Sequence, residues 1–130
     1  MMDLELIGKV AIITGGSDGL GRATAKRFAL EGAKVIICAR REEYLMTSAK
    51  SLSEETSGTV IGIQADVSSG DDCTKLIEET VQQFGCIDIL VNNAGSSLSK
   101  GLEELNDDQW YQDLDLKLMA EVRMNRIVIP

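Results

Sequence analysis

Short runs of β-branched and apolar residues alternate along the chain with segments whose apolar residues recur at helical spacing. The runs predict four buried strands, at residues 10–13, 34–39, 59–65 and 87–91, because a strand covered on both faces has no polar side. Segments with helical period separate these strands. Strands that alternate with helices favour a parallel sheet with right-handed crossovers. The pattern therefore predicts an α/β fold, a doubly wound parallel sheet of about four strands with flanking helices.

Glycines and polar residues mark the ends of the predicted helices. Gly32 closes the first helix, Ser57-Gly58 the second and Gly85 the third. Residues 69–72 and 106–109 each supply a cap and an acidic first turn for the helix that follows. In the first helix the residues that recur at helical period are Leu20, Ala23, Thr24, Phe28 and Ala29.

A glycine-rich turn follows the first strand directly. Gly15, Gly19 and Gly21 have the spacing G-x-x-x-G-x-G and lead into a helix. Such a turn gathers free backbone N–H groups at the positive end of a helix dipole, which favours a phosphate or a diphosphate. Glycine is needed because side chains would block the tight turn, the approach of the diphosphate and the packing of helix on strand. The turn alone is weak evidence, since many strand–helix turns carry two glycines for packing.

Two other phosphate-binding motifs do not fit this turn. A nucleoside triphosphatase loop requires Lys and then Ser or Thr after its last glycine, whereas Arg22 and Ala23 follow Gly21. The common dinucleotide fingerprint G-x-G-x-x-G has its short gap first, whereas here the long gap comes first.

Composition and charge narrow the classes of partner. The 130 residues suffice for one domain, and 44% of them are hydrophobic, enough to bury a core. Lys and Arg number 13 against 21 Asp and Glu, for a net charge of −8. Nucleic acid and anionic membranes both require a basic face, so the acidity argues against either as a partner. A phosphate site must rely on local dipoles and one or two placed cations.

The cysteine and histidine content indicates a reducing compartment and no metal. Cys38, Cys73 and Cys86 are odd in number and lie in predicted elements, as reduced buried thiols do. The chain has no His and no C-x-x-C pair, which argues against zinc or another transition metal. The amino terminus carries acids where a signal peptide carries bases, and no apolar stretch approaches a membrane span. The expected location is the cytoplasm.

Three motifs, each directly after a predicted strand, resemble those of the short-chain dehydrogenase/reductase family. They are TGGSDGLG at residues 14–21, ADV at 65–67 and NNAG at 92–95. The resemblance implies an NAD(P)-binding Rossmann domain over residues 1–130 and a small-molecule carbonyl or alcohol substrate. It implies a cofactor site formed by Thr14, Gly15, Ser17, Gly19, Leu20, Gly21, Arg40, Arg41, Asp66, Val67, Asn93, Ala94 and Gly95.

The resemblance also implies roles for the second and third motifs. Asp66 and Val67 would flank the adenine ring, Asn93 to Gly95 would line the nicotinamide-side ribose, and Asn92 would brace the sheet. From the residues alone, Asp66 can equally be a helix N-cap and Asn92-Asn93 a turn.

The end of the second strand bears on the choice of cofactor. In a doubly wound sheet this end lies beside the cofactor's ribose, where an acid binds the 2′-hydroxyl of NAD and an arginine accommodates the 2′-phosphate of NADP. Here Ala39 is followed by Arg40 and Arg41, and no carboxylate comes before Glu42. We therefore expect NADP rather than NAD, with Arg40 as the phosphate partner. The alternative is that both arginines are solvated residues at a helix start, and Asp18 in the turn points mildly against NADP.

The catalytic residues of the family are not in the chain. Family catalysis uses a Tyr with a Lys four residues later and an upstream Ser, but Ser48 follows Tyr44 at that distance and Asp115 follows Tyr111. Lys117 stands where the family usually has an active-site Asn. We therefore expect no catalytic residue here, and a chain that is the cofactor-binding half of such an enzyme, ending before the catalytic segment. The strand at 87–91 then lacks a later neighbour, so the chain alone should be marginally stable or associate through that edge.

Two alternatives stay open. A non-catalytic nucleotide-binding or dimerising module would keep the turn without an active site. A flavin or sugar-nucleotide binder is the weaker alternative, because those proteins space their glycines differently.

An apolar stripe of Trp110, Leu114, Leu118 and Val122 resembles the helix through which family members form oligomers, and ordinary core is the other interpretation.

Overall fold

The computed structural model describes residues 3–94 and 102–129, and the doubly wound fold is confirmed. Its four parallel strands lie in the order β3-β2-β1-β4. They are β1 (Val10–Thr14), β2 (Lys34–Ala39), β3 (Thr59–Gln64) and β4 (Ile89–Val91). In the register of the sheet, Ile12 of β1 pairs with Ile36 of β2 on one side and Leu90 of β4 on the other.

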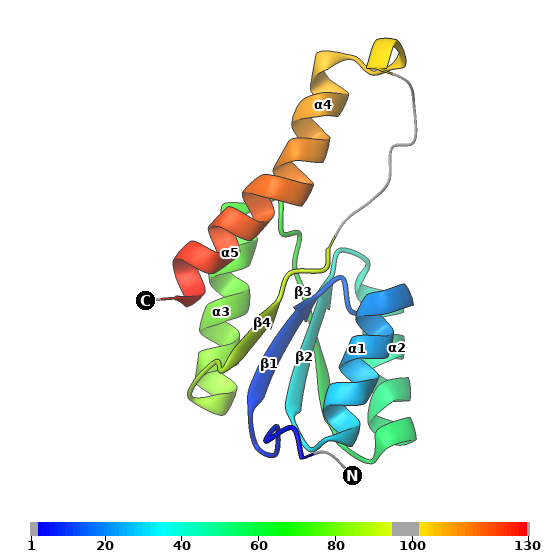
Figure 1. Cartoon of the computed structure of the whole chain (residues 1–130), viewed down its shortest axis with the longest axis vertical. Helices are drawn as coiled ribbons and strands as arrows, with labels where there is room; N and C mark the ends of the chain where they lie inside the picture. Colours follow the sequence, from blue (N-terminus) through cyan, green and yellow to red (C-terminus); the bar gives the residue numbers. More distant parts are fainter. Residues whose placement is uncertain (1–2, 95–101, 130) are drawn as a thin grey trace.

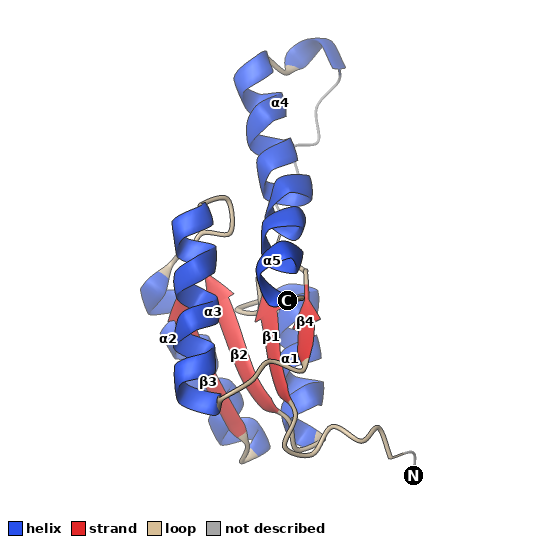
Figure 2. Cartoon of the chain, turned by 90° about the vertical axis from the view of Figure 1, so that its left-hand side faces the viewer, coloured by secondary structure: helices blue, strands red, loops and turns tan. Residues whose placement is uncertain are grey.

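Helices cover both faces of the sheet (Figure 1). One face is covered by α1 (Gly19–Leu30) and α2 (Glu42–Thr56), and the other by α3 (Gly70–Phe84) and α5 (Ala120–Val128). Figure 2 shows the three layers, with α3 on one side of the strands and α1 and α2 on the other.

Alternate side chains of the central strands enter two separate cores. Ile12 and Ile36 pack toward Leu76 of α3, whereas Ile13 and Ile37 pack toward Leu45 of α2. All six of these side chains are fully buried. Because successive residues of a strand point to opposite faces, both faces demand apolar residues, which explains the continuous apolar runs of the sequence.

The end of the chain forms one long helical rod. It consists of α4 (Asp107–Leu114), a π-helical turn (Asp115–Met119) and α5, preceded by a 3₁₀ turn at Leu102–Glu104. Its α4 end projects beyond the sheet (Figure 1). Within the described residues, no helix is both long enough and apolar enough to cross a membrane.

The predicted helix ends are confirmed at the level of single hydrogen bonds. Ser69 Oγ accepts the Asp72 N–H before α3, and Asn106 and Gln109 form a reciprocal capping box before α4. Ser57 and Gly85, which follow α2 and α3, adopt the left-handed conformation that ends helices.

Three expectations differ from the structure. The buried face of α1 consists of Gly21, Ala25 and Ala29, and Leu20 is 78% exposed, because the helix approaches the sheet through its smallest residues. Strand β4 begins two residues later than predicted, since the Asp88 carboxylate, not a strand carbonyl, accepts the Val10 N–H. The stripe of Trp110, Leu114, Leu118 and Val122 is between 39% and 54% exposed, so it is not core within this chain.

The open edge of β4 leads to a first prediction. Among the described residues β4 pairs with β1 alone, and its three residues are only half-buried. Unpaired N–H and C=O groups on an apolar strand are a template for pairing with another chain. We expect the isolated chain to associate through this edge or to unfold with low cooperativity. Analytical ultracentrifugation and circular dichroism test this, and a monomer with a cooperative melt would contradict it.

Candidate functional site

A cavity of about 400 Å³ opens at the carboxyl ends of the strands. This is the position at which doubly wound sheets bind ligands. Ten of the thirteen residues that the sequence predicts for the cofactor line it: Gly15, Ser17, Gly19, Leu20, Arg40, Arg41, Asp66, Val67, Asn93 and Ala94. Thr14 and Gly21 are not among the lining residues, and Gly95 lies outside the described residues.

Thr14 holds two walls of the cavity together. Its Oγ1 accepts the N–H groups of Asn93 (2.9 Å) and Ala94 (3.0 Å), which links the end of β1 to the segment after β4. The Asn93 side chain makes a second link, because its Nδ2 donates to the Gly15 carbonyl at 3.1 Å. Asn92 connects the same segment to the rod, where its Nδ2 donates to Asn125 Oδ1 at 3.0 Å.

Replacing Thr14 by Val should lower the free energy of unfolding by about 2 kcal/mol, since two amides lose their buried acceptor. Thr14 is 2% exposed, so water cannot readily take the place of the hydroxyl. Urea denaturation measures the change. Thr14→Ser, which keeps the oxygen, is the control and should be close to wild type. Equal stability of the Val variant and the wild type would contradict this role.

The glycine turn is shaped by contacts that leave no room for side chains. A Cβ on Gly21 would lie 2.3 Å from both Asn93 Nδ2 and the Gly15 carbonyl oxygen, and one on Gly16 would lie 2.5 Å from Ile37 Cγ2. Gly15 and Gly19 have φ values of +65° and +58°, in the left-handed region. A Cβ on Gly19 would meet no described residue within 4 Å, so within the described structure the turn faces open space there.

Backbone donors at the start of α1 face no side-chain cap. Asp18 occupies the N-cap position in an extended conformation, and its carboxylate makes no capping hydrogen bond. The first turn of a helix leaves N–H groups without intrahelical partners, and these groups carry the positive end of the helix dipole. The turn therefore offers an anion several donors without first displacing a protein group.

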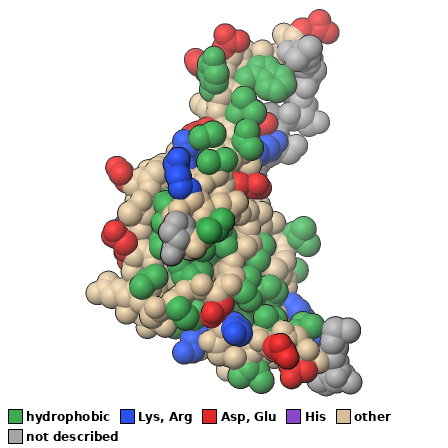
Figure 3. Space-filling view, turned by 60° about the vertical axis from the view of Figure 1, so that its left-hand side comes forward, with side chains coloured by type: hydrophobic (Ala, Val, Ile, Leu, Met, Phe, Trp, Pro, Cys, Tyr) green, Lys and Arg blue, Asp and Glu red, His purple; other side chains and the backbone are tan. Residues whose placement is uncertain are grey.

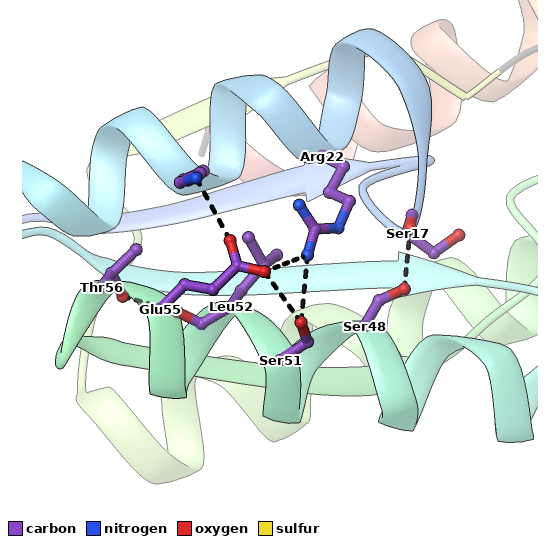
Figure 4. Close-up of polar contacts among 8 residues, drawn as sticks. Ser17, Arg22, Ser48, Ser51, Leu52, Glu55 and Thr56 are labelled. Carbon is purple, nitrogen blue, oxygen red and sulfur yellow. Dashed lines mark hydrogen bonds and ion pairs between the residues drawn. The ribbon is translucent and has the colours of Figure 1, made fainter.

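Among the described residues, Arg22, Arg40 and Arg41 lie near the turn, and two of the three have side-chain partners there. Arg22 reaches α2, where its Nη2 contacts Ser51 Oγ and Glu55 Oε1 (Figure 4). The Arg41 guanidinium lies over the Tyr44 ring, with its Cζ 5.4 Å from the centroid. Within the described part of the chain, the Arg40 guanidinium has no hydrogen bond or ion pair, and it borders both this cavity and a neighbouring one of about 340 Å³.

Asp66 and Val67 close the far side of the cavity. One Asp66 oxygen accepts the N–H (3.0 Å) and the hydroxyl (2.6 Å) of Ser68, while the Asp66 N–H donates to Asp72 at 2.8 Å. The interpretation of Asp66 as the helix N-cap is wrong, because Ser69 caps α3. Val67 is buried beside the cavity.

The chemistry of the lining favours binding over reaction. Burial raises the pKa of the Cys38 thiol to about 12, so it is not a nucleophile at neutral pH. Tyr44 and Tyr111 are exposed and are not among the lining residues. Lys117 is also exposed, and it pairs with Asp113 at 3.0 Å on the rod.

Sequence reasoning missed several residues of the lining. Cys38 and Ala65 lie at the ends of buried strands and could have been inferred from the sheet alone. Leu116 comes from the π-helical turn of the rod, 50 residues beyond Asp66 in the sequence. It belongs to none of the three motifs, and the signal that could have found it is its neighbour Lys117, which stands where the family usually has an active-site Asn.

Comparison with known proteins matches residues 9–130 to the short chain dehydrogenase family. Among curated relatives, 11-beta-hydroxysteroid dehydrogenase A of Sesamum indicum is 38% identical over 127 residues, a match that covers 97% of this chain and 36% of that protein. Uncharacterized oxidoreductase YvrD of Bacillus subtilis (strain 168) is 40% identical over 129 residues, covering 99% of this chain and 48% of that protein.

A solved structure agrees with the sequence matches. L-sorbose reductase from Gluconobacter frateurii, complexed with NADPH and L-sorbose, has a TM-score of 0.94 and 39% identity, covering 99% of this chain and 49% of that one. The chain thus spans less than half the length of these three proteins. Because the family match takes in all three motifs around the cavity, the chain belongs to the short chain dehydrogenase family.

Proposed function

We propose that the cavity binds NADP(H), and that the chain is the cofactor-binding part of a reductase or dehydrogenase that interconverts a carbonyl and an alcohol. The observation that carries the proposal is the Arg40 guanidinium, which no described residue partners, on the same cavity as the open glycine turn. A dinucleotide placed there would set its diphosphate on the turn and its 2′-phosphate beside Arg40. The NADPH complex of L-sorbose reductase, a protein of closely similar fold, supports the same choice.

The residues of this chain would bind and orient the cofactor. Amides of the turn would hold the diphosphate, Asp66 and Val67 would contact the adenine, and Asn93 and Ala94 would approach the nicotinamide-side ribose. NADP(H) would supply or take up the hydride of the reaction. The proton donor that the family uses lies in the Tyr-x-x-x-Lys segment, which these 130 residues do not contain.

Titration of the chain with NADPH and NADH, followed by nicotinamide fluorescence, tests the proposal. We expect saturable binding with NADPH the tighter ligand, and no carbonyl reduction by the chain alone. A response to neither nucleotide would reject the proposal. Binding without any reduction also agrees with the alternative of a non-catalytic nucleotide-binding module, and a sequence that continues into Tyr-x-x-x-Lys would decide for an enzyme.

The free cysteines of the described structure suit the cytoplasm as the proposed compartment. Cys38 and Cys73 are buried and Cys86 is exposed, and none of them is in a disulfide.

We also propose that the rod forms a homo-oligomer contact. Figure 3 shows apolar side chains along the protruding helix, and the exposed ones there include Trp110, Leu114, Leu118 and Val122. Leu118→Glu should shift sedimentation toward a smaller species, since a charge would be buried in the contact. Gln83→Glu adds the same charge on the exposed surface of α3 and should leave sedimentation unchanged. Identical profiles for both variants and wild type would reject this contact.

A further inference from the structure

One buried hydrogen bond ties α2 to the glycine turn. The Ser48 hydroxyl donates to the Ser17 carbonyl at 2.7 Å (Figure 4). Ser48 is 7% exposed and Ser17 is 8% exposed, so water has little access to either group. A hydroxyl buried in this way is costly to leave unpaired, and the carbonyl that it holds is costly to turn away.

The bond sets the direction of a whole peptide unit. A trans peptide directs its C=O and its N–H to opposite sides, and the structure has no cis peptide bond among its described residues. With the Ser17 carbonyl pointing to α2, the Asp18 N–H points away from α2. Both residues line the cavity, and within the described part of the chain no group accepts the Asp18 N–H. The reversed peptide would present an oxygen where the donors now lie.

Helix α2 is itself fixed to α1 beside this bond. Arg22 Nη2 lies 3.2 Å from Ser51 Oγ and 3.0 Å from Glu55 Oε1 (Figure 4). Lys26 Nζ lies 3.2 Å from Glu55 Oε2. Hydrogen bonds, that from Arg22 first, lower the pKa of Glu55 to about 2, so the carboxylate is ionised at neutral pH. Ser51 lies one helical turn after Ser48 on the same face of α2, so these contacts also hold the Ser48 hydroxyl next to the glycine turn.

From this geometry we infer that Ser48 is a positioning residue for the cofactor. Its hydroxyl orients the Ser17–Asp18 peptide so that an amide, not a carbonyl, faces the diphosphate. The inference rests on the proposed function, because it takes the diphosphate of NADP(H) to be the anion on the turn. Ser48 itself does not line the cavity and acts through the backbone of Ser17.

The test compares Ser48→Ala with Ser53→Ala. Ser53 is on the same helix, and its hydroxyl donates to the Val60 carbonyl of β3 at 2.8 Å, so both variants lose one hydroxyl–carbonyl bond. Ser53 Oγ also accepts the Val60 N–H at 3.3 Å, so urea denaturation should show a loss of stability in Ser53→Ala at least as large as that in Ser48→Ala. Titration with NADPH should show binding weakened about tenfold in Ser48→Ala and close to wild type in Ser53→Ala. Adenosine 2′-phosphate, which has no diphosphate, should bind all three proteins equally, and Ser48→Thr should restore NADPH binding.

A measurement on the unaltered chain covers the case in which Ser48→Ala does not fold. Hydrogen exchange of the Asp18 amide, followed by NMR, should slow when NADPH is added. Three results would each overturn the positioning role. The first is unchanged exchange at Asp18 on addition of NADPH. The others are an equal loss of affinity for NADPH and adenosine 2′-phosphate in Ser48→Ala, and a loss of NADPH affinity in Ser53→Ala as large as that in Ser48→Ala. If the wild-type chain binds no NADPH, the proposed function fails, whereas unaltered NADPH binding by Ser48→Ala removes the positioning role alone.

Discussion

Arg40→Ala is expected to weaken NADPH binding about 30-fold while changing NADH binding less than about twofold. The guanidinium borders the cavity, and no described residue competes for it. A charge-assisted contact with the 2′-phosphate is made by NADPH alone, so its loss should separate the two nucleotides. Fluorescence titration at fixed ionic strength measures both dissociation constants.

Arg41→Ala is the matched control for this experiment. Arg41 is the next residue and also lines the cavity, but its guanidinium lies over Tyr44. Removing the same charge there should weaken NADPH binding much less. An equal loss of affinity for NADPH and NADH in Arg40→Ala would reject the preference for NADP. A larger loss of NADPH affinity in Arg41→Ala than in Arg40→Ala would show that Arg41, not Arg40, contacts the 2′-phosphate.

Gly21→Ala is expected to abolish measurable NADPH binding and to lower the free energy of unfolding by about 3 kcal/mol. The new Cβ would lie 2.3 Å from the Gly15 carbonyl oxygen, a backbone atom that cannot move without moving the turn. Helix α1 must therefore shift away from the sheet, and its N-terminal amides shift with it. Titration with NADPH and urea denaturation report the two effects separately.

Gly70→Ala shows whether a glycine at a helix start matters in itself. Gly70 begins α3, and a Cβ there would meet nothing within 4 Å. Its replacement should leave nucleotide binding unchanged and stability equal or slightly higher, since Ala favours the helix. Wild-type affinity and stability in Gly21→Ala would show that the turn tolerates a side chain.

The strands and the helix ends could be predicted from local sequence signals. The strands are continuous apolar runs because helices cover both faces of the sheet, and Gly85 ends α3 because its φ is +85°. The inward face of α1 could not be predicted from apolar period. Which residues of α1 face inward depends on how closely the helix approaches Asn93 and Gly15. This close approach favours Gly21 over the larger Leu20.

The cavity was predictable where motifs meet strand ends and not where the rod contributes. Ser48 shows a second limit. It falls on the stripe of Leu45, Ala49 and Leu52, so its hydroxyl must find a partner once buried. Thr80 has the same kind of position on α3, yet its hydroxyl donates to Leu76 of its own helix at 2.8 Å. The sequence indicates that such a hydroxyl needs an acceptor, but only the packing of α2 on the turn selects Ser17.

The exposure of Trp110 gives the chain a built-in optical reporter. It is the sole tryptophan in the sequence, and it stands on α4 with 39% of its surface in solvent. Self-association along the helical rod would exclude water from the indole and move its emission to shorter wavelength, whereas pairing between sheet edges would leave the emission where it is. Emission spectra recorded at a series of protein concentrations can therefore distinguish the two modes of assembly.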